Sequence, residues 1–316
     1  MALVTSFRVG GLKCHTLEGG RQWLDGGAMF GVVPKPLWER RIAADARNRI
    51  PLALRCLLVE HGDGLVLIDT GLGNKENEKF RDIYGVENAG TRGPTQLEDA
   101  LAAAGFKPED VRWVVNTHLH FDHAGGNTCV EWREGGRAGG REETAGSASR
   151  HPAVPSSRLS FPNATYVVQR GELQFASHTN ERTAASYLEP NFAPVGAAGR
   201  WRLVSGETEL VPGIRLVPTP GHVPHHQSVV IADGGERACF LGDLVPTAAH
   251  VPLPWIMAYD LEPLVTLETK RSLLSRAEAD GWILVFEHDP AQALGRVVRE
   301  GKSLSCAPLD TPSGQD

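Results

Sequence analysis

The chain has 316 residues, of which 41% are hydrophobic and 22% charged, and its formal net charge is −6. This length suits one large domain or two small ones. The acidic balance argues against nucleic acid or an anionic membrane as a partner, and no apolar run reaches the roughly eighteen residues that could span a bilayer.

The N-terminus and the cysteines indicate where the protein acts. Met1–Arg8 does not combine a basic region with a following apolar stretch, so we expect no signal peptide. The five cysteines are scattered and form no CxxC pair, which is typical of reduced thiols. We therefore expect a cytoplasmic protein.

The first part of the chain alternates strand-like and helical segments. A Gly- and Pro-rich stretch, 26–38, reads as irregular. Apolar positions at helical spacing predict a helix over 96–104, which Gly105 ends. Hydrophobic runs predict strands at 7–9, 13–17, 52–60, 64–69 and 111–115.

The second part begins with a segment, 132–158, that is rich in Gly, Arg, Glu and Ser and has no apolar period. We expect it to be a flexible surface insertion. A strand at 164–168 is followed by a polar region, predicted as helical, that contains His178 and Tyr187. A helix is predicted over 261–279, and the tail from about 303 is expected to be frayed. Further strands are predicted at 200–204, 214–217, 228–231, 238–241 and 282–286.

This order of elements predicts an α+β fold. Strands cluster in each half of the chain, with helices between them and near the end of each half. Each sheet must bury its hydrophobic face against another layer of secondary structure. We therefore expect two packed β-sheets flanked by helices, within a single domain over 1–316.

The segment 117–123, Thr-His-Leu-His-Phe-Asp-His, directly follows the strand predicted at 111–115. It places four metal-ligating side chains on one loop. This spacing is too compact for one face of a helix and too dense in ligand-type residues for an ordinary core. Imidazole and carboxylate together suit zinc or a similar divalent metal. The ligating residues of this loop are His118, His120, Asp122 and His123.

Three more predicted strands end in a ligand-type residue, namely His222, Asp243 and His288. Strand ends that share one rim of a sheet can converge on a point, and loops at such rims commonly hold functional groups. Seven ligands exceed the four of one tetrahedral zinc, so they predict two divalent metals. Zinc is the first expectation, with manganese, cobalt or iron as alternatives. Structural zinc sites are usually closed four-ligand sites, which disfavours the alternative of a structural or sensory metal protein.

These motifs, with Asp69-Thr70-Gly71, Thr219-Pro220-Gly221-His222 and Gly242-Asp243, resemble the metallo-β-lactamase superfamily. The resemblance implies an αβ/βα sandwich of two mixed sheets with a dinuclear metal centre between them. It puts His118, His120 and His222 on the first metal, and Asp122, His123 and His288 on the second. Asp243 would bridge the metals, while Asp69 and His226 would support the ligands without binding a metal.

Asp243 distinguishes branches within this family. True β-lactamases of the family typically lack a bridging aspartate, whereas lactonases, glyoxalase II-like thioesterases and organophosphate hydrolases have one. We favour opening of lactones, such as acyl-homoserine lactones, or cleavage of esters by a metal-bound hydroxide, with Asp122 and Asp243 as the catalytic carboxylates. Phosphotriester hydrolysis, thioester hydrolysis and weak β-lactamase activity stay open as alternatives.

The substrate pocket is harder to predict. Two stretches, one around Met29, Phe30 and Trp38 and the other at 252–257, are unusually apolar for loops. They either pack against an edge of the sandwich or a dimer interface, or form an apolar wall above the metals. We therefore expect a small-molecule substrate with an apolar part, and we keep a homodimer open. Well-known lactonases carry a tyrosine where this chain has Pro246, so His250, Tyr187 or the metal itself would stabilise the oxyanion. The predicted pocket residues are Met29, Phe30, Trp38, Tyr187, His250, Trp255 and Met257.

Overall fold

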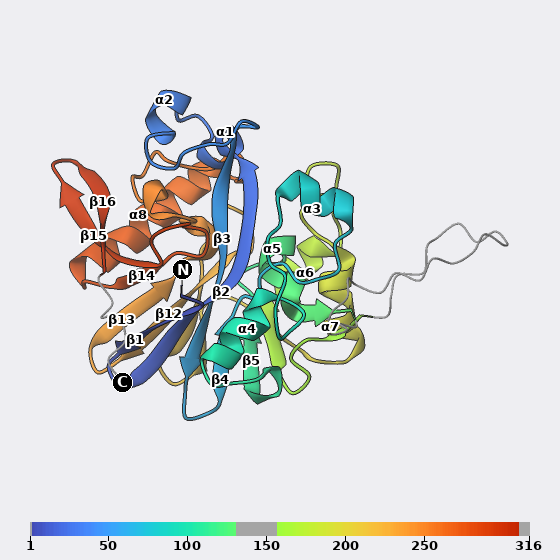
Figure 1. Ribbon diagram of the computed structural model, residues 1–316. Helices are drawn as coiled ribbons and strands as arrows, with labels where there is room; N and C mark the ends of the chain where they lie inside the picture. The colour runs from blue at the N-terminus through green and yellow to red at the C-terminus, as the bar shows by residue number, and fades with distance from the viewer. Residues whose placement is uncertain (1, 131–156, 310–316) are drawn as a thin grey trace.

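The computed structural model describes residues 2–130 and 157–309, and it consists of two seven-stranded sheets packed face to face. Helices cover the outer face of each sheet (Figure 1). The two sheets are mixed, because each combines parallel and antiparallel neighbours. The predicted α+β sandwich is confirmed.

The N-terminal sheet has the strand order β1-β2-β3-β4-β5-β8-β9. The first four strands form an antiparallel meander, after which β4, β5, β8 and β9 run parallel. Parallel strands place their C-terminal ends on the same edge of the sheet, so the loops that follow β4 and β5 are neighbours. The strands are β1 Val4–Val9, β2 Leu12–Asp25, β3 Arg49–Glu60, β4 Leu65–Ile68, β5 Val111–Val115, β8 Thr165–Gln169 and β9 Trp201–Val204.

The C-terminal sheet has the order β10-β11-β12-β13-β14-β15-β16, with only the β13–β14 pair parallel among its described strands. That parallel pair again brings two strand ends to one edge. The strands are β10 Thr208–Val211, β11 Ile214–Pro218, β12 Gln227–Asp233, β13 Glu236–Phe240, β14 Ile283–Val285, β15 Leu294–Glu300 and β16 Ser303–Pro308. A separate two-stranded ribbon pairs β6 Thr128–Cys129 with β7 Arg158–Leu159.

The main hydrophobic core lies between the sheets, where side chains such as Val59 and Ile68 meet Val229 and Phe240. The outer face of the C-terminal sheet packs against α8, and that of the N-terminal sheet packs against α4. The helix α4 begins with a capping box formed by Thr95 and Glu98. The helices are α1 Gly26–Phe30, α2 Lys35–Trp38, α3 Glu78–Tyr84, α4 Gln96–Ala103, α5 Phe121–Ala124, α6 Arg170–Ala176, α7 Ala193–Ala197 and α8 Pro263–Ala279.

Three predictions about elements are wrong. The stretch 26–38, expected to be irregular, contains the short helices α1 and α2. The polar region around His178 and Tyr187 is not helical, because α6 ends at Ala176 and the chain then runs through turns. The tail from 303 is not frayed as far as the structure describes it, because β16 pairs with β15 along its whole length. Backbone pairing keeps this polar edge hairpin ordered, and its composition alone did not predict it. Strand β10 was also not predicted.

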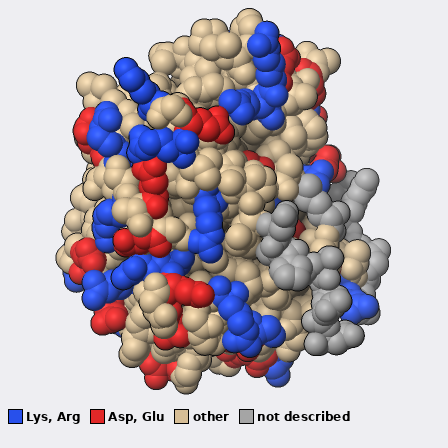
Figure 2. Space-filling model, turned by 90° about the vertical axis from the view of Figure 1, so that its left-hand side faces the viewer, with Lys and Arg blue, Asp and Glu red and all other residues tan. Residues whose placement is uncertain are grey.

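Nearly all of the predicted insertion at 132–158 lies outside the described residues. Within the described part of the chain, no helix is long and apolar enough to cross a membrane. On the face shown in Figure 2, acidic and basic side chains are interspersed rather than separated into patches.

Candidate metal centre

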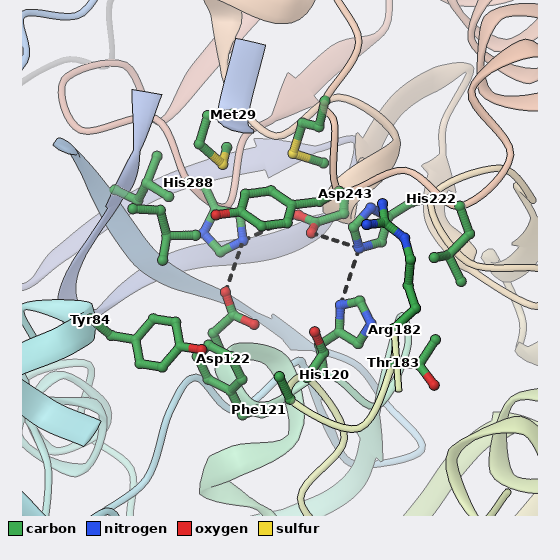
Figure 3. Close-up of a pocket in the computed structure, with 17 residues that line it drawn as sticks. Met29, Tyr84, His120, Phe121, Asp122, Arg182, Thr183, His222, Asp243 and His288 are labelled. Carbon is green, nitrogen blue, oxygen red and sulfur yellow. Dashed lines mark hydrogen bonds and ion pairs between the residues drawn. The ribbon is translucent and has the colours of Figure 1, made fainter. Parts of the chain in front are cut away.

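The seven predicted ligands come together at the edge where the parallel strands end. His118 and His120 follow β5, and Asp122 and His123 lie on the short helix α5. The other three follow strands of the C-terminal sheet, so both sheets contribute. Figure 3 shows Asp243 between His222 and His288, with His120 and Asp122 on the opposite side. All seven side chains are buried except the half-buried His120.

The ligands form two adjacent clusters. Ligand atoms of His118, His120, His222 and Asp243 lie within 4.8 Å of one another, as do those of Asp122, His123 and His288. Asp243 faces both clusters, since one carboxylate oxygen is 3.1 Å from His222 Nε2 and the other is 3.1 Å from His288 Nε2. We call these groups the His118 cluster and the His123 cluster.

In His118 and His288, one ring nitrogen is held by the protein and the other faces the centre. His288 Nδ1 donates to the carbonyl of Ala53 at 2.8 Å, which leaves Nε2 toward the centre. His118 Nδ1 contacts Thr117 Oγ1, and its Nε2 is buried with no hydrogen-bond partner among the described residues. An unpartnered buried nitrogen, and imidazole nitrogens that face one another beside carboxylates, fit two divalent metals.

The electrostatics of the centre also favour cations. Burial and the neighbouring imidazoles hold the pKa of His118 well below its usual value. Burial would also lower the pKa of His288, but Asp243 outweighs it and raises that pKa to about 9. Carboxylates therefore stabilise positive charge at the His123 cluster even without metal. In the His118 cluster, burial opposes a proton on His222, but Asp243 and Asp260 outweigh it and raise the pKa of His222.

Each cluster has supporting residues behind it. In the His118 cluster, His222 Nδ1 donates to Asp260 Oδ1 at 2.9 Å. Burial lowers the pKa of His226 to about 3, so this ring is neutral at pH 7. Its Nε2 accepts from the backbone N–H of Asp243 at 3.1 Å, while Nδ1 faces Thr219 Oγ1 at 2.8 Å. His226 thus fixes the turn that carries Asp243.

Asp69 supports the His123 cluster. It accepts from Thr117 N at 2.7 Å and from Thr117 Oγ1 at 2.6 Å, and its Oδ2 lies 3.1 Å from His123 Nδ1. Asp69 has a left-handed backbone with φ 54°, which a short polar side chain tolerates better than most. The side-chain amide of Gln22 donates to Asp122 Oδ2. Such contacts orient ligands and increase their basicity.

The sequence matches the metallo-beta-lactamase superfamily over residues 50–288. The chain belongs to the metallo-β-lactamase superfamily.

Relatives of this superfamily member include an N-acyl homoserine lactonase from Bacillus cereus, 29% identical over 58% of this chain and 60% of that protein. The lactonase AttM from Rhizobium radiobacter is 28% identical over 61% and 63%, respectively. The chain therefore spans about three fifths of the length of these relatives.

Solved structures extend the similarity over nearly the whole chain. A probable metal-dependent hydrolase from Staphylococcus aureus has a TM-score of 0.81 and 29% identity, and the match covers 97% of this chain and 100% of that one. The dizinc quorum-quenching lactonase AidC has a TM-score of 0.74 and 18% identity, covering 97% of each chain. The latter likeness concerns the fold alone.

Three supporting residues of this metallo-β-lactamase centre were not predicted from the sequence: Gln22, Asp260 and Glu287. Glu287 is an acidic residue at the end of an apolar strand, which was a visible signal. Gln22 and Asp260 carry no such signal, because long-range folding brings β2 and the 255–261 segment to the ligands.

A cavity of about 230 Å³ opens onto the ligands (Figure 3). Met29 and Met257 line it as predicted, together with the apolar side chains of Leu24, Leu52 and Leu261. Tyr84, Tyr259 and Arg182 also line it and were not predicted. The cavity lining therefore combines apolar side chains with two phenols, a guanidinium and the carboxylates of Asp122 and Asp243.

The other predicted pocket residues do not line this cavity. Phe30 stacks on Trp38 at 5.3 Å and on His250 at 4.6 Å, and Trp255 packs edge-on against it. The rings of Phe30, Trp38, His250 and Trp255 form an aromatic layer behind Met29 and Met257. Burying these large rings is more favourable than exposing them.

Both alternatives proposed for the oxyanion donor are already hydrogen-bonded elsewhere. His250 contacts Thr247 Oγ1 and the carbonyl of Met29, and burial lowers its pKa to about 3. The Tyr187 hydroxyl donates to Glu172 at 2.9 Å, while its ring packs against His120. Pro246, in the position of the lactonase tyrosine, accepts from His288 N at 3.0 Å. Stabilisation of the oxyanion is therefore left to a metal or to other side chains.

Proposed function

We propose that this protein is a dinuclear metal-dependent hydrolase that opens lactones, and that N-acyl homoserine lactones are its substrate class. The observation that carries the proposal is the pair of ligand clusters at the base of a cavity with an apolar wall. The relatives named N-acyl homoserine lactonase support the same class. An acyl chain would lie along Leu24, Leu52 and Leu261, with the lactone ring at the ligands.

The metals, when bound, would polarise the lactone carbonyl and lower the pKa of a water to about 7. The chain's own residues would then orient and transfer protons. Asp243, between the clusters, would orient the attacking water. Asp122 Oδ2 is held by Gln22, so Oδ1 is the oxygen that would take a proton from water and pass it to the leaving alkoxide.

Two phenols are placed to donate to the carbonyl oxygen as it becomes negative. Burial and nearby Asp122 raise the pKa of Tyr84, and burial raises the pKa of Tyr259 to about 12. Both therefore keep their proton at neutral pH. Neither hydroxyl makes a hydrogen bond with another described residue, so both are available to a substrate in the cavity.

The reaction adds one water across the acyl carbon–oxygen bond of the ring. The hydroxyl of the water ends on the carbonyl carbon, and its proton ends on the alkoxide of the opened ring. Because the leaving group stays attached, the product is a single hydroxy acid. This product would carry a carboxylate, for which Arg182 at the cavity is a suitable partner.

A panel of substrates tests the proposal with zinc-loaded protein: hexanoyl- and decanoyl-homoserine lactone, a simple γ-lactone, paraoxon, nitrocefin and a glutathione thioester. We expect the acyl-homoserine lactones to have the highest kcat/KM, and the longer chain to have the lower KM because it covers more apolar wall. Dominant turnover of paraoxon or the thioester would contradict the proposal while leaving the metal centre intact.

A further inference from the structure

Glu287 lies directly behind the His123 cluster. It follows β14 and precedes His288, and its side chain is fully buried. Its Oε2 is 3.0 Å from His123 Nδ1. Neither carboxylate oxygen makes a hydrogen bond with a described residue. A buried carboxylate without hydrogen bonds is costly, so its presence needs an explanation.

A second carboxylate already occupies the hydrogen-bonding direction of the same nitrogen. Asp69 accepts from His123 Nδ1 at 3.1 Å and from two donors of Thr117. One N–H can make only one well-aligned bond, so Asp69 orients the ring. Glu287 approaches Nδ1 at a similar distance without such a bond, and therefore acts on it as a charge.

In the described part of the chain no lysine or arginine side chain pairs with Glu287, and the imidazole of His123 is the ion-pair partner that it has. The nearest guanidinium to its backbone is that of Arg55, which donates to the carbonyls of Phe286 and Asp289 and pairs with Glu18. The polypeptide alone thus leaves this carboxylate poorly compensated.

Metal cations would supply the missing compensation. Asp69, Asp122, Asp243 and Glu287 surround His123, and each carries one negative charge when ionised. Two divalent cations carry four positive charges, which would balance these four carboxylates. A negative charge on the far side of an imidazole also makes that imidazole a stronger ligand.

We propose that Glu287 is a positioning residue that increases the cation affinity of the His123 cluster by charge, in addition to the orienting hydrogen bond from Asp69. The same charge contributes little to the stability of the metal-free protein, because it has no hydrogen bond and no lysine or arginine partner among the described residues. This inference rests on the metal centre and not on the lactone as substrate. It would stand if the substrate panel favoured another ester.

The test is the Glu287→Gln variant, which keeps the shape and removes the charge. Metal-free wild type and variant are titrated with zinc against a chromophoric chelator, and their unfolding in urea is compared without metal. We expect the binding of one zinc to weaken by about ten- to a hundredfold while the other is retained. We also expect the metal-free variant to be at least as stable as metal-free wild type.

Glu76→Gln is the control, because Glu76 is half-buried and also has an unpartnered carboxylate oxygen, but the charges near it are those of Lys75 and Arg81 instead of the imidazoles. It should bind both zinc ions as wild type does. Unchanged zinc affinity in Glu287→Gln would overturn the inference, and so would weaker binding accompanied by lower metal-free stability, which would indicate a purely structural role.

If Glu287→Gln does not fold, Glu287→Asp replaces it, because it keeps the charge but draws the carboxylate back from His123. The affinity for one zinc should then fall less than tenfold. An affinity equal to that of wild type, despite the longer separation, would show that proximity to Nδ1 is irrelevant and would overturn the inference.

Discussion

The two ligand clusters use the same kinds of side chain but are embedded differently. The His118 cluster is supported by one carboxylate, that of Asp260, which accepts a hydrogen bond from His222. Asp260 lies in a loop whose neighbouring residues line the cavity. The His123 cluster is supported by two carboxylates, Asp69 and Glu287, which lie close to His123. Gln22 and Ala53, on strands of the N-terminal sheet, also make hydrogen bonds to its ligands. Geometry thus makes the sites similar, while the surrounding charge makes them unequal.

This difference has a direct physical consequence. The buried carboxylates of Asp69 and Glu287 lie behind His123, whereas the single carboxylate of Asp260 lies behind the His118 cluster. We expect the His123 cluster to depend more strongly on charge for metal retention. Residues of both clusters line the cavity, and His120 of the His118 cluster also packs against Tyr187.

The largest effect is expected where the clusters meet. Asp243→Asn keeps the shape of the side chain but removes the charge that faces both His222 and His288. Both zinc affinities should fall, and kcat/KM for hexanoyl-homoserine lactone should drop by at least about a hundredfold. Zinc content and initial rates measure this. A folded variant with two zinc ions and wild-type rates would remove Asp243 from the centre.

A pair of variants separates the clusters. Asp69→Asn should lower the affinity for one zinc ion by about ten- to a hundredfold, and Asp260→Asn should lower the affinity for the other by a similar factor. Asparagine also accepts the positive φ of residue 69, so backbone strain does not confuse the result. A zinc titration of the double variant should show both steps weakened. If both single variants weaken the same step, the division into two clusters is wrong.

A smaller effect concerns the cavity above the clusters. Tyr84→Phe and Tyr259→Phe each remove one hydroxyl that can donate to the developing oxyanion. We expect kcat to fall by about ten- to a hundredfold in whichever variant loses the principal donor, with KM and zinc content little changed. Steady-state kinetics and metal analysis test this. Full activity in the double variant would leave oxyanion stabilisation to the metals.

The smallest effect concerns Lys270, a buried amine that donates to the carbonyls of Pro252, Leu253 and Trp255 on the Asp260 side of the centre. Burial lowers its pKa from 10.5 to about 7, although Asp260 opposes the shift. The unfolded chain therefore binds a proton that the folded protein has lost between pH 7 and 10.5. Unfolding takes up that proton, so stability rises with pH in this window and the penalty is fully present below it.

Lys270→Met should flatten this dependence. Between pH 7 and pH 9, the wild-type free energy of unfolding should rise by up to about 1.4 kcal/mol per pH unit more than that of the variant. Urea unfolding of metal-free protein at the two pH values measures the difference. Parallel pH profiles would mean that the three carbonyls keep Lys270 charged throughout.

Much of the centre could be predicted from local sequence because each ligand follows a strand. Parallel pairing of β4 with β5, and of β13 with β14, then places those ends together. The fold class was predictable for the same reason, since buried strands have a hydrophobic signature. The edge hairpin of β15 and β16 was not, because its strands are mostly polar and are held by pairing with each other.

The cavity was harder to predict than the ligands. Apolar loops indicated that side chains gather near the metals, but they did not reveal which would face the substrate. Met29 lines the cavity while its neighbour Phe30 points into an aromatic layer. Tyr84 reaches the cavity by packing on Phe121, a contact between α3 and α5 that no local pattern encodes. Tertiary packing decides such positions.

The most direct test of the account is a zinc titration of metal-free wild-type protein, with hydrolysis of hexanoyl-homoserine lactone followed at each step. We predict that two equivalents bind and that turnover rises mainly with the second, because both clusters must be filled. Binding that saturates at one equivalent with full turnover, or no binding at all, would contradict the two-metal centre.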